Sequence, residues 1–358
     1  KEKIYHISSI ILTNWNIKLH YNCKPWLWAA FLGSLVLLNT IDPAIAAKKA
    51  TCSGSSLIEE IQAGDPDAFA AIMAESQKTE NGDALLWRIS KAGIPDSYLF
   101  GTVHMTDDRV TKLSKQVKEA ISDAKVVALE VADTSPTAVS SALANAPSLM
   151  MFDDGRRLDL LVSPEHFSKV KDQLEAARLP SKFAQLFKPW VVSMVMAVSE
   201  CERKRMEGGK PVLDMRLANL ASAKSIPVVG LETVQSQLEA AASVPMEEQV
   251  AMLGLSLQFA DRAEDLRETI LQLYLARQLG ALLPLQKALA KRYGIKDTEF
   301  AGFRSRMVDQ RNRKMRTHAL PLLAKGNVFI GVGALHLIGE DGLVALLRNA
   351  GYTLEPVE

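Results

Sequence analysis

The chain has 358 residues with 42 basic and 41 acidic side chains, and 48% of its residues are hydrophobic, enough for a sizeable core. Aromatic residues make up 6%, and no block of like charge interrupts the sequence. This composition excludes a basic nucleic-acid-binding stripe and a disordered acidic tail, so we expect a peptide or small-molecule substrate bound in a pocket.

Residues 1–47 are predicted to be an export signal. Lys18 and Lys24 precede an apolar run from Trp26 to Leu38, and the small residues up to Ala46 and Ala47 suit a cleavage site. The run has 13 residues, whereas a membrane-spanning helix needs about 20. We therefore expect cleavage near Ala46 or Ala47, a periplasmic or secreted protein, and no permanent membrane anchor after cleavage.

The true start of the chain is uncertain, because the sequence opens with Lys1 and its first Met is Met73. Removal of residues 1–47 takes away four Lys, one Glu and one Asp, which leaves 38 basic and 39 acidic residues (42 − 4 and 41 − 2). The remaining domain is therefore nearly neutral.

Cys52 and Cys201 are the cysteines that remain after such a cleavage. An oxidising compartment would allow this even pair to form a disulfide. Two unpaired thiols are the alternative, because the sequence does not supply the separation between the two side chains.

The first elements after the signal are two short helices within residues 55–76. Residues 85–90 and 97–103 have strand character, and the turn residues 93–96 between them predict a hairpin. The pattern then predicts a helix over residues 109–123.

A continuous apolar run, residues 126–129, ends on Glu130 and is typical of a strand covered on both faces. Residues from 136 to about 300 are mostly helical in pattern, which predicts a large helical insertion. A strand at residues 226–231, preceded by a helix, interrupts this region and ends on Glu232.

The last predicted elements are a helix at 303–324, a strand at 328–332, a helix at 340–350 and a strand at 352–357. Alternation of strands and helices predicts an α/β fold with a mostly parallel central sheet flanked by helices. We assign it to residues 48–358, with the helical insertion at about 136–300.

Two strands end in the same pattern, G-x-x-H. Gly101 to His104 closes one strand near the start of the domain, and Gly333 to His336 closes another near its end. A glycine lets the backbone approach a neighbouring chain closely, and the histidine three residues later leaves the carboxyl end of the strand. Ligands of open α/β sheets bind at that edge.

Glu130 occupies the same position on a third strand, so we expect His104, Glu130 and His336 to converge. Two imidazoles and one carboxylate leave open coordination positions on a divalent ion, which predicts a metal site capable of catalysis. The alternative is that each histidine caps a carbonyl group or packs in a polar crevice. His166 and His318 fall on predicted helices and are expected at the surface.

Several short segments follow one another in a specific order: Leu86-Trp87-Arg88, Tyr98 to His104, Ala128-Leu129-Glu130, Val212-Leu213-Asp214, Gly230 to Thr233, Arg311-Asn312 and Phe329 to His336. In this order they resemble the TraB/GumN family, which is related to the Tiki proteins. The resemblance covers about residues 50–358. It implies a fold shared with the erythromycin-esterase and ChaN-like proteins, in which both G-x-x-H elements face one site.

The resemblance also implies a chemistry. In Tiki relatives it is metal-dependent peptide cleavage, and for this chain it implies a divalent metal, Mn, Co or Zn, held by His104, Glu130 and His336. It further implies that Cys52 and Cys201 form a disulfide.

Asp214, Glu232, Gln235 and Arg311 match family positions as well. Arg311 is a candidate for holding a substrate carboxylate or a developing oxyanion, with a helix-surface ion pair as the alternative. Glu232 is a candidate general base or a residue that orients a histidine, with a helix-capping carboxylate as the alternative. Glu130, Glu232 and Arg311 form the predicted catalytic set.

Three functions are consistent with these residues. The favoured one is an exported metal-dependent hydrolase of the peptidase type. The others are a non-enzymatic protein that sequesters a peptide or haem, and a metal-independent esterase that uses a histidine as its base. The sequence contains no G-x-S-x-G elbow, H-E-x-x-H helix, P-loop or G-x-G-x-x-G pattern that would favour another chemistry.

Overall fold

The computed structural model of the protein describes residues 52–133, 136–296 and 300–358. The predicted export signal, residues 1–47, lies outside the described residues. The predicted domain boundaries therefore stay predictions. Within the described ranges, no helix combines the length and the apolar character that crossing a membrane requires.

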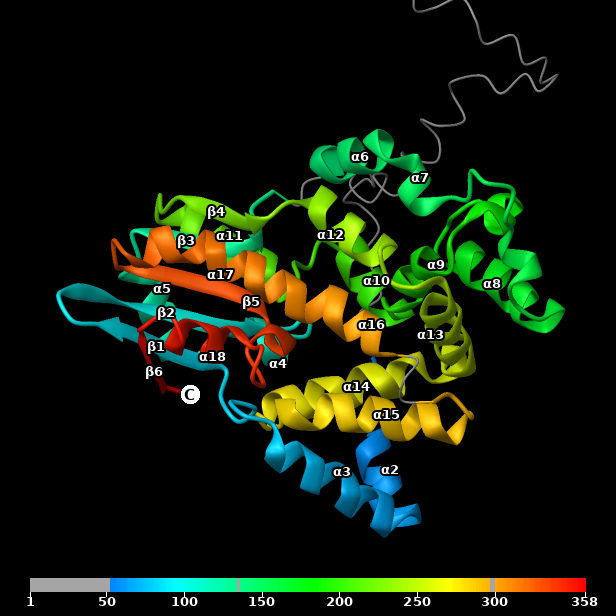
Figure 1. Ribbon diagram of the computed structural model, residues 1–358, viewed down its shortest axis with the longest axis horizontal. Coiled ribbons are helices and arrows are strands. Elements are labelled where there is room, and N and C mark those ends of the chain that lie inside the picture. The colour runs from blue at the N-terminus through cyan, green and yellow to red at the C-terminus, as the bar shows by residue number, and fades with distance from the viewer. Residues whose placement is uncertain (1–51, 134–135, 297–299) are drawn as a thin grey trace, which may run out of the picture.

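A six-stranded sheet forms the centre of the fold (Figure 1). Its strands are β1 (Leu86–Lys91), β2 (Ile94–Thr102), β3 (Val126–Val131), β4 (Val228–Glu232), β5 (Val328–Gly333) and β6 (Thr353–Pro356). Their order is β4-β3-β5-β2-β1-β6. The pairs β4–β3, β3–β5 and β5–β2 are parallel, whereas β2–β1 and β1–β6 are antiparallel. The predicted mostly parallel sheet is confirmed.

Helices occupy most of the remaining chain. Those before β4 are α2 (Leu57–Gly64), α3 (Pro66–Lys78), α4 (Asp108–Thr111), α5 (Lys115–Ser122), α6 (Pro136–Asn145), α7 (Pro147–Met150), α8 (Pro164–Ala176), α9 (Pro189–Met196), α10 (Glu200–Glu207) and α11 (Leu213–Ala223). Those after β4 are α12 (Val234–Ala242), α13 (Met246–Gln258), α14 (Ala263–Leu275), α15 (Leu282–Arg292), α16 (Ala301–Arg304), α17 (Gln310–Leu323) and α18 (Leu343–Arg348).

The sheet is covered on both faces, as the apolar run of β3 predicts. Helices α17 and α18 lie on one face, and α5 and α11 lie on the other (Figure 1). Leu217 of α11 and Met315 of α17 are both fully buried in the core that includes the strands. This sandwich leaves the ends of the parallel strands as the place where polar side chains meet.

Three predicted elements differ in detail. The hairpin turn is shorter than predicted, because β2 begins at Ile94 directly after Gly93, whose φ is +77°. The predicted helix at 109–123 is two helices, because α4 ends at Thr111 and Ser114 caps the start of α5 by accepting a hydrogen bond from Val117 N. The predicted helix at 303–324 contains a π-helical turn, Ser305–Asp309, between α16 and α17.

The predicted disulfide is present. Cys52 is bonded to Cys201 of α10, with 5.6 Å between the two Cα atoms and a sequence separation of 149. It joins the segment that precedes α2 to the helical region between β3 and β4.

Candidate functional site

The two G-x-x-H elements lie side by side because β2 and β5 are adjacent and parallel. Gly101 pairs with Val332, and Thr102 pairs with Gly333. A Cβ at Gly101 would lie 3.0 Å from Leu337 Cδ2 and 3.2 Å from Ala334 Cα. Glycine therefore allows the two strand ends to pack together.

The second glycine faces the strand-end glutamate. A Cβ at Gly333 would lie 3.1 Å from Glu130 Oε1, and the Gly333 N–H donates a 2.6 Å hydrogen bond to the same oxygen. Sequence reasoning identified both glycines by their spacing, and the structure gives the reason for each.

His336 is buried, and its ring orientation is fixed by an amide. Asn312 Nδ2 donates to the carbonyl oxygen of Asp341 at 2.8 Å, so Asn312 Oδ1 is the atom that faces His336 Nδ1, at 2.6 Å. Since that oxygen accepts, Nδ1 carries the proton and Nε2 is unprotonated. Burial lowers the pKa of His336 to about 4, so the ring is neutral at physiological pH.

The Nε2 atom of His336 lies 3.7 Å from Glu130 Oε1. It is too far for a hydrogen bond and close enough for both atoms to contact one ion between them. A neutral imidazole with a free Nε2 is the form that binds metals.

His104 is held in a similar way by a carboxylate. Its Nδ1 lies 2.7 Å from Asp214 Oδ2, and Asp214 Oδ1 accepts a 2.7 Å hydrogen bond from Thr102 Oγ1. The side chain of His104 is 64% exposed. The Asp214 carboxylate raises the pKa of His104 above its usual value.

Glu130 connects the two histidines electrostatically. Burial alone would raise its pKa, but the neighbouring His336, Arg311 and His104 outweigh burial and lower the pKa to about 2. Glu130 Oε2 accepts hydrogen bonds from Arg311 Nη2 at 2.6 Å and from Gln237 Nε2 at 3.0 Å. The carboxylate is therefore ionised and fixed.

Arg311 is buried between two carboxylates. Besides Glu130 it contacts Glu232, whose Oε2 accepts from Arg311 Nε at 2.9 Å and from Nη2 at 2.7 Å. The alternative of a helix-surface ion pair for Arg311 is wrong, because the residue is 7% exposed. The helix-capping alternative for Glu232 is also wrong, because Thr233 caps α12 through Ser236.

Two residues that contact this site were missed or misplaced by sequence reasoning. Gln237 reaches Glu130, whereas Gln235 points elsewhere and its Nε2 donates to Glu239 Oε1 at 2.9 Å. Asn312 was noted only as part of a matching segment. Helical spacing would have separated Gln235 from Gln237, since positions two apart on a helix face different directions.

His166 and His318 lie away from this arrangement, on α8 and α17 as predicted. His318 Nδ1 is 2.5 Å from the carbonyl oxygen of Leu231. His166 is partly buried and has Gln258 as a neighbour at 3.4 Å.

The donor chemistry of the site fits a divalent ion. Among the described residues, no three His, Cys, Asp or Glu side chains are gathered closely enough to form a complete ligand set as they stand. Nevertheless, each histidine is anchored through Nδ1 to Asp214 or Asn312, the arrangement that orients metal-binding histidines in proteins. The unprotonated donor is His336 Nε2, which lies 3.7 Å from the ionised Glu130.

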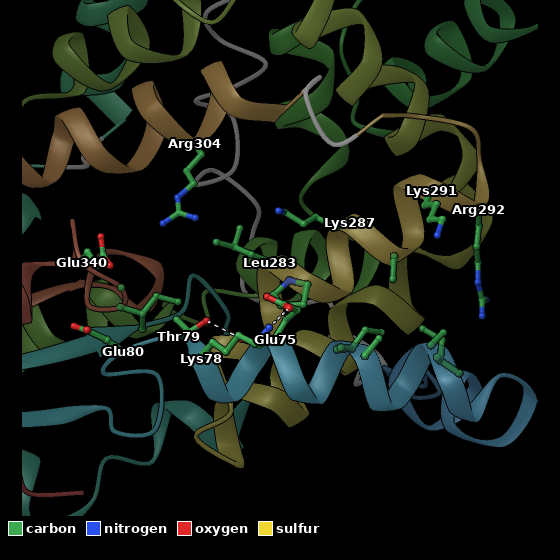
Figure 2. Close-up of a pocket in the computed structure, with 18 of the residues that line it drawn as sticks. Glu75, Lys78, Thr79, Glu80, Leu283, Lys287, Lys291, Arg292, Arg304 and Glu340 are labelled. Atoms are coloured by element: carbon green, nitrogen blue, oxygen red, sulfur yellow. Dashed lines mark hydrogen bonds and ion pairs between the residues drawn. The ribbon is translucent and has the colours of Figure 1, made fainter.

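A cavity of about 930 Å³ adjoins the loop that follows His336. Figure 2 shows it between α3, α15 and this loop, with Arg304 and Glu340 on its edges. The loop residue Asp341 also holds Asn312 through its carbonyl oxygen. The loop that lines one side of the cavity is therefore the same loop that follows His336.

The sequence profile of the TraB/PrgY/gumN family matches residues 85–356. Metalloprotease TIKI1 of Danio rerio is 26% identical over 318 residues, which cover 76% of this chain and 63% of that relative. Metalloprotease TIKI2 of Xenopus tropicalis is 23% identical over 331 residues, 77% of this chain and 60% of that relative. The chain thus spans less than two thirds of the length of these two Tiki proteins.

A bacterial relative is similar over most of its own length. The uncharacterized protein YbaP of Shigella flexneri is 26% identical over 267 residues, which cover 73% of this chain and 90% of that protein. No solved structure matches the chain.

Proposed function

This chain belongs to the TraB/PrgY/gumN family, and from that premise we propose that it is an exported, metal-dependent hydrolase that cleaves peptides. One observation carries the proposal. His104 and His336 are each anchored through Nδ1, so their Nε2 atoms are the positions left for a ligand, and His336 Nε2 lies 3.7 Å from the ionised carboxylate of Glu130. The similarity to the Tiki metalloproteases supports this reaction class.

We assign the metal ligands as His104, Glu130 and His336. When bound, a divalent ion in this site would polarise a substrate carbonyl and supply a nucleophilic water near neutral pH. Mn, Co and Zn all suit a set of two nitrogens and one oxygen.

The other residues of the site prepare these ligands. Asp214 and Asn312 orient the two rings, and Gly333 N and Gln237 fix Glu130. Arg311 pairs with the buried carboxylates of Glu130 and Glu232, and we assign it to stabilising negative charge that develops beside them. Glu232 stays in the proposed catalytic set as the candidate general base, and its contacts with Arg311 connect it to Glu130.

The cavity beside the His336 loop offers room for substrate. Its volume of about 930 Å³ lies within the range of ligand pockets in proteins. Its lining mixes apolar side chains such as Ile72 and Leu283 with charges of both signs, which suits a segment of polypeptide. Export fits the Cys52–Cys201 disulfide, since such bonds persist in oxidising compartments.

The test is elemental analysis of the purified protein after exposure to Mn, Co and Zn, beside the variants His104→Ala, Glu130→Gln and His336→Ala. We expect about one ion per chain in the wild type and loss of that ion in each folded variant. His166→Ala is the matched control, because it removes a histidine outside the site. A wild-type protein that stays metal-free under all three conditions overturns the proposal.

Cleavage of a peptide library is the second measurement. Activity should disappear with a chelator and return when the metal is restored. Activity that survives chelation would instead indicate the metal-independent esterase, and metal binding without cleavage would indicate a sequestering protein.

A further inference from the structure

A second group of charged side chains, most of them buried, holds the loop that follows His104. We call it the ion cluster, and its members are Asp107, Arg109, Glu202, Arg205, Glu264, Arg267 and Glu268. Arg267 is 4% exposed and lies within 4 Å of carboxylates from the loop, from α10 and from α14 itself. The cluster therefore ties three parts of the chain together.

Glu202 of α10 is the member that contacts the loop most directly. Its Oε2 accepts a hydrogen bond from the backbone N–H of Thr106 at 2.8 Å and another from Thr106 Oγ1 at 2.7 Å. Glu202 is 5% exposed and Thr106 is 1% exposed. Thr106 lies two residues after His104.

The second oxygen of Glu202 is not satisfied by a hydrogen bond. Within the described ranges, Oε1 has no donor and faces Arg267 Nη1 at 3.8 Å. A buried carboxylate that leaves one oxygen unbonded is costly to a fold. The two hydrogen bonds from Thr106 to Oε2 are therefore the main compensation for burying this carboxylate.

The disulfide holds Glu202 in place. Its neighbour Cys201 is bonded to Cys52, and the Cys201 backbone N–H donates to Glu264 Oε1 at 2.9 Å. Glu264 Oε2 in turn accepts from Arg267 Nε at 3.0 Å. The disulfide is therefore connected to the loop by two sets of contacts. One passes through Glu202, and the other passes through Glu264 and Arg267.

His104 is consequently fixed from both sides although its own ring is exposed. On one side Thr102 is bonded to Asp214 of α11, and on the other Thr106 is bonded to Glu202 of α10. An exposed ligand loses its geometry unless the surrounding residues hold its backbone.

We propose that Glu202 is a positioning residue for His104 and that the Cys52–Cys201 disulfide keeps Glu202 in place. The link to catalysis rests on the proposed function, in which His104 is a metal ligand. The link between Glu202 and the loop does not depend on any metal.

Hydrogen exchange of the metal-free protein tests the link to the loop. In Glu202→Ala, amides of residues 103–111 should exchange about tenfold faster, the factor that corresponds to one lost buried hydrogen bond. Glu202→Gln should stay close to the wild type, because its amide oxygen still accepts from Thr106. Glu200→Ala, an exposed position on the same helix, is the matched control. Exchange in Glu202→Ala that equals the wild type overturns the proposal.

Metal affinity separates this proposal from the proposed function. If the wild type binds Mn or Zn, Glu202→Ala should bind it at least about tenfold more weakly, with recovery in Glu202→Gln. Unchanged affinity in Glu202→Ala overturns the positioning role. If the wild type binds no metal, the proposed function fails, and exchange of residues 103–111 alone decides whether Glu202 holds the loop.

A more conservative variant, Thr106→Val, replaces Glu202→Ala if that variant does not fold. Thr106→Val removes the hydroxyl donor at nearly constant shape, and Thr106→Ser keeps it. We expect faster loop exchange in the first and wild-type exchange in the second. Equal exchange in both overturns the proposal.

Reduction of the Cys52–Cys201 bond tests the role proposed for the disulfide. A dithiol such as dithiothreitol supplies two electrons and two protons, which convert the Cys52–Cys201 bond to two thiols, and is itself oxidised to its cyclic disulfide. Exchange of residues 103–111 should then accelerate in the wild type. Loop exchange that does not change on reduction overturns the role given to the disulfide.

Discussion

The two G-x-x-H elements have the same sequence pattern and neighbouring strand ends, but they place their histidines in opposite environments. His336 is buried, bonded to a neutral amide and has a pKa lowered to about 4. His104 is exposed, bonded to the Asp214 carboxylate and has a raised pKa. The G-x-x-H pattern places each histidine at the end of its strand. The partner of Nδ1 and the depth of burial then decide whether the ring is protonated.

This difference has a physical use for a metal site. The buried histidine is already neutral and can bind an ion without releasing a proton. In the proposed metal site, the exposed histidine would be the ligand nearer to solvent, and its carboxylate partner would strengthen its basicity. The Glu130 carboxylate interacts electrostatically with both histidines.

The largest expected effect comes from Arg311→Ala, which removes the cation that anchors Glu130 beside both histidines. Two buried carboxylates are then uncompensated, and we expect the free energy of unfolding to fall by about 3–5 kcal/mol at neutral pH. Chemical denaturation measures this. Stability should recover partly as the pH is lowered, because the carboxyl groups take up protons. A loss below about 1 kcal/mol would mean that Glu130 does not depend on Arg311.

The histidines themselves should differ in their contribution to stability. His336→Ala leaves the Oδ1 atom of Asn312 buried without a donor, and we expect a loss of about 1–3 kcal/mol. His104→Ala changes an exposed side chain and should cost less than about 0.5 kcal/mol. Thermal unfolding of the two metal-free variants compares them directly. Equal losses would show that the two environments are alike.

The two glycines give a smaller and more local test. Gly101→Ala places a methyl group against Ala334 backbone atoms that cannot move easily, and we expect a loss of about 1–2 kcal/mol. Gly333→Ala meets side-chain atoms only, with Glu130 Oε1 nearest at 3.1 Å and no backbone atom of the described residues among the nearest contacts, so its cost in stability should be lower. The measurement is denaturant unfolding of both variants. A larger loss for Gly333→Ala would reverse this order.

The smallest expected effect is a change in one pKa, followed by NMR titration of the metal-free protein. In the wild type, the His104 ring should stay protonated at higher pH than a free histidine, and His336 should stay neutral until about pH 4. Asp214→Asn removes the nearby negative charge, so the pKa of His104 should fall toward about 6.5. The pKa of His336 should barely change. If the pKa of His104 does not change in Asp214→Asn, the Asp214 carboxylate is not the cause of the difference in pKa between the two histidines.

Much of the sheet was predictable because its signals are local. The hairpin, the strand that ends at Glu130 and the two G-x-x-H elements depend on turn chemistry and apolar runs within ten residues or so. The glutamate and both histidines were therefore found from strand ends alone. The rule that parallel strands end at one edge predicted that they would converge, and His336 Nε2 does lie 3.7 Å from Glu130 Oε1.

The partners of these residues were not predictable in this way. Arg311 lies 181 residues from Glu130, and Asn312 and Gln237 come from two different helices. Which side chain of a helix reaches the site depends on how that helix is rotated and where it begins. The π-helical turn before α17 is a local feature of this kind, and periodicity did not predict it.

The sequence by itself determined the class of fold, the strand ends and the identity of the histidines, the glutamate and the cysteine pair. Tertiary structure alone decided the strand order, in which β5 lies between β3 and β2, and hence which residues share an edge. It also decided the protonation of the two histidines. Strand patterns act over a few residues, whereas burial and charge depend on neighbours brought from anywhere in the chain.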